Sequence, residues 1–196
     1  MTVLVAAPTY SGKDYALPAY LAAYRAFTCH DRLLFMVDNT RGTLSYARKL
    51  RALGVETAHV EPMPDFWDMM EQCWRLIVER AHDLDCEYIA SIEADVICPP
   101  QTLEVLLAHV DGARPVMAGV PQHDQWRFDM WTTSCVLLRT DWLFESRFLW
   151  PTGWEVMICE SGPVLLQGLL TIEHLDDENE PGWQGGEGKV FGSGRG

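Results

Sequence analysis

The sequence has no long apolar run and no basic leader segment, and these two absences exclude classes of protein. No stretch approaches the ~20 apolar residues that a membrane-spanning helix requires. The N-terminal MTVLVAAPTY has no basic segment before a long apolar core, so the pattern does not indicate a signal peptide. We therefore expect a soluble, cytoplasmic protein that is not bound to a membrane.

Basic residues are also few, since 15 Lys and Arg stand against 28 Asp and Glu and leave a net charge of −13. Nucleic-acid phosphates are neutralised mainly by Lys and Arg, so this balance argues against a general nucleic-acid-binding surface. A nucleic acid held by a local basic patch remains open. The six cysteines include no CxxC pair, and their spacing is typical of neither a zinc cluster nor a disulfide framework. We expect free thiols.

The chain length and the apolar pattern favour a single α/β domain. A chain of 196 residues that is 48% hydrophobic can bury a substantial core. Strand-like apolar runs alternate with helical patterns through the first half, which predicts a Rossmann-like, mostly parallel central sheet with helices on both faces. The runs that predict its strands are Thr2–Ala7, Leu33–Val37, Val55–Val60 and Tyr88–Ile92.

Further elements follow from helix periodicity and capping signals. Asp65 is expected to cap a long helix whose buried stripe begins at Phe66, and Pro99-Pro100 are expected to open another helix. From Asp176 the chain is acidic and then glycine-rich, which predicts a flexible tail. The remaining predicted elements are helices over 17–27, 44–53 and 140–144 and strands over Val116–Val120, Thr132–Leu138 and Val164–Ile172.

Polar residues follow three of the predicted parallel strands, namely Pro8-Thr9-Tyr10, Asp38-Asn39 and Glu93-Ala94-Asp95. In open α/β sheets ligands bind at the carboxyl ends of the strands, so these residues predict a binding site at one sheet edge. Structural alternatives stay open for each of them. Thr9 suits a turn, Asp38 suits an Asx-turn with Asn39, and Asp95 suits the cap of a following helix.

Motifs of several phosphate-binding families are missing. Gly12-Lys13 has no preceding glycine at the Walker spacing, and the glycines of Gly192–Gly196 are not followed by a helix. An NTPase and a Rossmann dehydrogenase are therefore disfavoured. Sugar nucleotidyltransferases carry a glycine-rich loop with a basic residue after the first strand, and APTYSGKDY does not match that pattern.

The stretch from Cys73, CWRLIVERAHDLDCEYIASIEADVICPPQTLEVLLAHV, resembles the central part of GT-A glycosyltransferases, most of all family 2 and its small phage-type relatives. These enzymes pair an Arg-bearing helix with a strand that ends in an Asp-x-Asp motif, which reads Glu93-Ala94-Asp95 here. A weaker resemblance extends from Val3 to His174. Downstream, WEVMICE resembles the acidic segment that supplies the catalytic base, although Trp154 replaces its first acid.

The resemblance implies a metal-dependent glycosyltransferase that moves a sugar from a nucleoside-diphosphate sugar, with UDP favoured, to an acceptor hydroxyl. The acceptor class is open among a glycan, a small molecule and, in a phage setting, a hydroxylated DNA base. A divalent cation, Mn²⁺ or Mg²⁺, would neutralise the charge that develops on the leaving diphosphate. Trp154 keeps a non-catalytic binding relative open as an alternative, and a nucleotidyltransferase is the other.

The resemblance also assigns residues to these roles. It implies Asp95 and His174 as metal ligands, and Glu155 as the base that accepts the acceptor proton. The residues expected to contact the nucleotide-sugar are Pro8, Thr9, Tyr10, Asp38, Asn39, Arg75 and Glu93.

Overall fold

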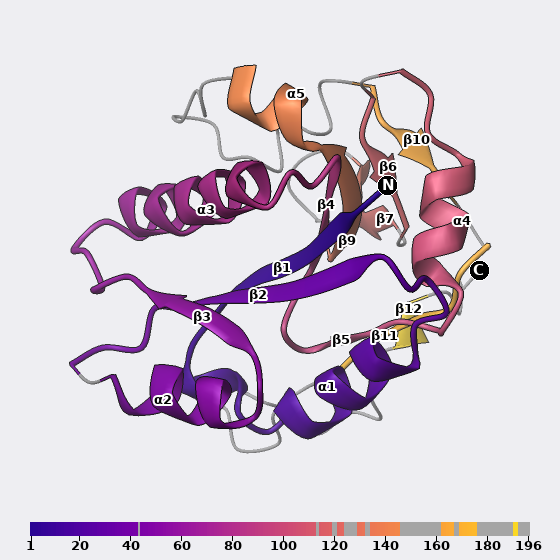
Figure 1. Ribbon diagram of the computed structural model, residues 1–196. Coiled ribbons are helices and arrows are strands. Elements are labelled where there is room, and N and C mark those ends of the chain that lie inside the picture. Colours follow the sequence, from indigo (N-terminus) through magenta and orange to yellow (C-terminus); the bar gives the residue numbers. More distant parts are fainter. Residues whose placement is uncertain are drawn as a thin grey trace.

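The computed structural model describes residues 1–42, 44–112, 114–118, 121–123, 129–131, 134–145, 162–166, 169–175 and 190–191. Within them, the main sheet has seven strands in the order β10-β6-β9-β4-β1-β2-β3 (Figure 1). The pairs β3-β2, β2-β1, β1-β4 and β6-β10 are parallel, and β9 is antiparallel to both of its neighbours. These strands are β1 Val3–Thr9, β2 Arg32–Asp38, β3 Glu56–His59, β4 Tyr88–Ile92, β6 Val116–Met117, β9 Cys135–Arg139 and β10 Val164–Leu165.

Helices cover both faces of this sheet, as the sequence predicts. Alternate residues of β1 point to opposite faces. Val3 and Val5 pack in one core cluster with α1, α2 and α4, whereas Leu4 and Ala6 pack in a second cluster with α3. Figure 1 accordingly shows α3 on the opposite side of β1 and β2 from α1 and α2. The helices are α1 Leu17–Ala26, α2 Ser45–Ala52, α3 Phe66–Asp83, α4 Thr102–Ala108 and α5 Thr140–Glu145, with a 3₁₀ helix, η1, over Ser11–Lys13.

Two smaller sheets complete the described architecture. β5 (Val96–Ile97) pairs antiparallel with β11 (Ile172–His174), and β11 pairs with β12 (Val190–Phe191). β7 (Pro121–His123) pairs with β8 (Asp129–Trp131). The first of these sheets matters for function because β5 begins at the residue after Asp95.

Several sequence predictions need correction. The single strand predicted over Val164–Ile172 is wrong, since β10 and β11 belong to different sheets. Asp95 does not cap the following helix, because α4 begins at Thr102 with Gln101 as its N-cap residue. The cap at Asp65 is confirmed, since its Oδ1 accepts a hydrogen bond from the Asp68 amide at 3.1 Å. Phe66 was expected in the buried stripe of α3, yet it is 56% exposed.

Within the described residues, no helix combines the length and the apolar character needed to cross a membrane.

Two leucines that are register partners on β1 and β2 differ in burial, and this difference predicts how much each contributes to the free energy of unfolding. Leu4 is fully buried, whereas Leu33, its register partner, is 40% exposed. Leu4→Ala removes buried methyl groups and leaves a cavity, so we expect it to lower the free energy of unfolding by about 2–5 kcal/mol. Leu33→Ala should cost less than about 1 kcal/mol. Urea unfolding followed by circular dichroism measures both, and equal losses would contradict this account of the core.

Candidate functional site

A cavity of about 710 Å³ lies at the carboxyl ends of β1, β2 and β4. This volume is in the range of small-ligand sites. The strand ends that the sequence singles out therefore do meet at one edge of the sheet. Six of the residues expected there line this cavity: Pro8, Thr9, Tyr10, Asn39, Glu93 and Asp95.

The loop between β1 and α1, residues 10–16, lines the cavity with Tyr10, Ser11 and Lys13 and is held by three contacts. The Ser11 amide donates to Thr40 Oγ1 at 2.9 Å. Lys49 of α2 forms an ion pair with Asp14 at 2.6 Å. The Lys13 ammonium contacts the carboxylate of Asp95. The loop thus joins the end of β2 to the end of β4, with Lys13 placed in the cavity between them.

The ring of Tyr10 folds back over Gly12 in this loop. A Cβ atom at position 12 would lie 2.2 Å from Cε2 of that ring. The absent side chain of Gly12 therefore lets the aromatic ring lie close to the backbone and line the cavity.

Asp95 is the most enclosed carboxylate of the cavity wall, with 1% of its surface exposed. Its Oδ2 accepts a hydrogen bond from Tyr15 Oη at 3.3 Å in addition to the contact with Lys13. Its main-chain oxygen accepts from the Leu175 amide at 2.8 Å. Because β11 pairs with β5, His174 lies in register with Val96, the residue after Asp95. The backbone of the second predicted metal ligand is thus next to the first, while the His174 side chain lies outside the described part of the structure.

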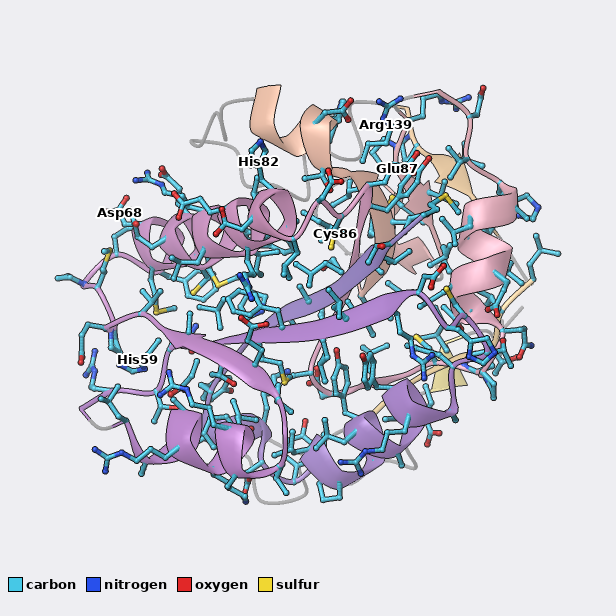
Figure 2. The ribbon with its side chains drawn as sticks, viewed as in Figure 1. His59, Asp68, His82, Cys86, Glu87 and Arg139 are labelled. Atoms are coloured by element: carbon cyan, nitrogen blue, oxygen red, sulfur yellow. The ribbon has the colours of Figure 1, made fainter. Side chains whose placement is uncertain are left out.

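Asp38 is also fully buried, but it does not line the cavity. Its Oδ1 accepts from the Thr40 amide at 2.9 Å, and this bond closes the Asx-turn that the sequence allowed. Its Oδ2 accepts from the Ala47 amide at 3.1 Å and lies 3.1 Å from Nδ1 of His59, at the carboxyl end of β3. Figure 2 shows His59 near the end of the sheet opposite to Glu87. The carboxylate of Asp38 thus shapes the loop that carries Asn39 and Thr40, and its predicted nucleotide contact stays a prediction.

Two other predicted residues lie elsewhere. Arg75 of α3 forms an ion pair with Glu71 at 2.9 Å, is half exposed, and is not among the residues that line the cavity. Glu155, the predicted base, lies outside the described residues together with Trp154.

The first turns of α3 form an apolar wall of the cavity that sequence reasoning missed. It consists of Phe66, Met69, Met70 and Trp74, together with Pro62 from the preceding loop. The helical period of these residues resembles that of an ordinary core stripe, so periodicity alone could not separate a cavity wall from a buried face. Lys13 was missed as well, although a basic residue shortly after the first strand was a usable signal.

Burial decides the ionisation of two groups behind the cavity. It raises the pKa of the Cys73 thiol to about 12, and it raises the pKa of the Tyr46 hydroxyl to about 12 as well. Both groups therefore stay protonated near neutral pH. The Thr9 hydroxyl is buried, and its hydrogen bond with Tyr46 lowers the pKa of the Tyr46 hydroxyl against the larger effect of burial.

No family model and no curated protein sequence matches this chain. Solved structures do match it. The S. aureus TarS fragment 1–349 in complex with UDP is 13% identical, with a TM-score of 0.59 over 85% of this chain and 58% of that one. A 4-diphosphocytidyl-2C-methyl-D-erythritol synthase is 15% identical, with a TM-score of 0.59 over 86% of this chain and 90% of that one. A197 from STIV is 14% identical, with a TM-score of 0.53 over 91% and 87% of the two chains.

The chain has a GT-A-like fold. The resemblance to nucleotide-sugar transferases and the predicted fold class are both confirmed at this level by the sheet topology and the structural neighbours. The chain spans only 35% of TarS and 58% of its 1–349 fragment. The cavity at the ends of β1, β2 and β4 is the candidate functional site of this fold.

The contacts of Asp38 predict that this residue supports the wall of the candidate site. Asp38→Ala leaves two amides, those of Thr40 and Ala47, without their acceptor, so the free energy of unfolding should fall by at least about 2 kcal/mol. Hydrogen exchange at these two amides should accelerate. Asp111→Ala is the control, because this side chain is 70% exposed. Unchanged stability and unchanged exchange in Asp38→Ala would show that the buried carboxylate does not hold the loop.

Proposed function

We propose that this protein transfers a sugar from a nucleoside-diphosphate sugar, with UDP-sugar favoured, to an acceptor hydroxyl. The observation that carries the proposal is the single cavity in which Thr9, Asn39 and Asp95 meet at the ends of three adjacent strands of a GT-A-like fold. Structures of TarS 1–349 in complex with UDP and with UDP-GlcNAc support the choice of donor.

The residues that line the cavity suit both the base and the diphosphate of a nucleotide. The apolar wall of α3 offers flat and polarisable surfaces to a base, and Tyr10 lines the same space. Lys13 and Arg41 bring cationic groups to the cavity of a chain whose net charge is −13. A diphosphate is the part of the donor that such cations stabilise.

A divalent cation, Mn²⁺ or Mg²⁺, fits the chemistry of this site. The carboxylate of Asp95 is the oxygen ligand that such ions prefer, and the contact with Lys13 shows that a positive charge is accommodated against it. Among the described residues, no group of three or more His, Cys, Asp or Glu side chains could hold a metal ion by itself. Asp95 and His174 would accordingly share the ion with diphosphate oxygens, and the ion would supply charge stabilisation for the leaving group.

The transfer step needs a group that takes the acceptor proton. The acceptor oxygen bonds to the anomeric carbon while the bond from that carbon to the diphosphate breaks and the diphosphate leaves with the electron pair. Glu155 is the proposed base, as the resemblance implies. The acceptor can be a glycan, a small molecule or a hydroxylated DNA base.

Two observations favour a second candidate, a nucleotidyltransferase. Lys13 does place a basic residue of the loop after β1 in the cavity, and the erythritol synthase is matched over 90% of its length. Such an enzyme consumes a nucleoside triphosphate and releases pyrophosphate, whereas the proposed glycosyltransferase releases a nucleoside diphosphate. Incubation with a panel of UDP-sugars and, separately, with CTP or UTP plus sugar phosphates distinguishes the two by product.

Asp95→Asn should lower metal-dependent turnover at least about 100-fold, because the charge that holds the cation is lost. Circular dichroism should show an intact fold. Turnover of a UDP-sugar at limiting Mn²⁺ is the measurement, and Asp111→Asn on the exposed surface is the matched control. A variant as active as the parent protein at low Mn²⁺ would remove Asp95 from this role.

Glu155→Gln should lower turnover about 10²–10⁴-fold while donor affinity stays within a few-fold, because general-base help has this typical size. Isothermal titration with UDP and Mn²⁺ reports binding, and release of UDP in the presence of acceptor reports turnover. Parent-like turnover would exclude Glu155 as the base. Donor binding without any hydrolysis or transfer by the parent protein would favour the non-catalytic relative that Trp154 keeps open.

A further inference from the structure

We propose that Lys13 is a built-in counter-cation that competes with the divalent metal for Asp95, and that the donor diphosphate relieves this competition. The inference rests on the proposed function, and it adds the reason why metal and nucleotide would bind together. It concerns the ion pair of Lys13 with Asp95 within the cavity, which the sequence analysis did not predict.

The geometry at Asp95 carries the first step. This carboxylate is 1% exposed, and its Oδ2 is in contact with the Lys13 ammonium and 3.3 Å from the Tyr15 hydroxyl. A metal ion that binds this oxygen must take the position of the ammonium. Two cations cannot share such an enclosed carboxylate without strong repulsion, because Coulomb energies are large where water is excluded. Lys13 therefore opposes metal binding as long as it stays paired with Asp95.

The second step is the freedom of the Lys13 side chain to move away. Its side chain is 26% exposed, whereas Asp95 lies almost fully inside. The loop that carries it is fixed independently by the bond from Ser11 to Thr40 and by the ion pair of Asp14 with Lys49. The ammonium can thus turn on its flexible four-carbon stem while the loop backbone keeps its place.

A diphosphate in the same cavity supplies the new partner. Lys13 and Asp95 both line the cavity, so phosphate oxygens placed beside them meet the ammonium directly. In this exchange the Lys13 ammonium leaves the Asp95 carboxylate and pairs with the diphosphate. The metal would then bind the carboxylate oxygen that Lys13 has left. The exchange replaces ionic contacts and breaks no covalent bond. The nucleotide then raises metal affinity, and by linkage the metal raises nucleotide affinity by the same factor.

The test is Mn²⁺ binding, followed by electron paramagnetic resonance of the free ion, with and without UDP. In the parent protein we expect weak Mn²⁺ binding that UDP strengthens. In Lys13→Met we expect Mn²⁺ alone to bind about 10-fold more tightly, and the strengthening by UDP to shrink, within the usual range of coupling between sites. Lys49→Met is the matched control, since it removes a lysine that anchors the same loop without touching Asp95.

Two further variants guard the interpretation. Lys13→Gln keeps a hydrogen-bond donor for Asp95 but removes the charge, so this variant should also bind Mn²⁺ more tightly than the parent protein. It replaces Lys13→Met in the test if Lys13→Met fails to fold. Asp95→Asn should lose the Mn²⁺ binding in both the parent and the Lys13→Met background, which locates the ion at this carboxylate. Circular dichroism confirms the fold of each variant.

The outcomes separate the two proposals. Folded Lys13 variants whose affinity for Mn²⁺ alone is unchanged or weaker would overturn the competition, even where UDP binds the parent protein well. A parent protein that binds no UDP, with or without Mn²⁺, would instead overturn the proposed donor site. The competition between Lys13 and Mn²⁺ would still be decided by the measurements with metal alone.

Discussion

The parallel pairing of β1 with β2 on one side and with β4 on the other is the constraint on which the candidate site depends. The register places Thr9 opposite Asp38, and it aligns Val3 of β1 with Tyr88 of β4, so the three strands end at the same edge. Buried side chains on both faces of β1 hold this register, because a slip by one residue would move each of them to the wrong face. The cavity follows from that edge.

The two buried carboxylates at this edge of the sheet differ in their electrostatic surroundings. Two fully enclosed carboxylates, Asp38 and Asp95, end adjacent regions of the sheet, yet their surroundings differ. Asp38 is surrounded by backbone amides and His59, which fix it as part of the framework. Asp95 faces Lys13 and Tyr15 across a cavity wall. In our proposal the Lys13 side chain can leave Asp95, which makes this carboxylate accessible to a cation. The amides of Thr40 and Ala47 hold Asp38 in place.

The elements of the first half could be predicted because their signals are local. Tyr88–Ile92 is predicted with the bounds that β4 has, and the Asp65 cap lies where the pattern indicates. The later strands could not be predicted in this way. β5 and β11 have two and three residues, and they pair with each other across a long sequence separation that local signals do not report. In the candidate site, the convergence of Thr9, Asn39 and Asp95 could be predicted from the rule for strand ends. The contact of Lys13 with Asp95 could not, because it depends on the path of the loop between β1 and α1.

The hydrogen bond from the Tyr15 hydroxyl to the Leu175 carbonyl spans 160 positions of the chain. The Leu175 amide also donates to the main-chain oxygen of Asp95, and Tyr15 donates to the Asp95 carboxylate, so residues far apart in the sequence surround Asp95. During synthesis on the ribosome, the strands β1, β2 and β4 can pair well before Leu175 leaves the exit tunnel. The candidate site would therefore be completed only after Leu175 has left the tunnel, when most of the sheet that supports it has formed.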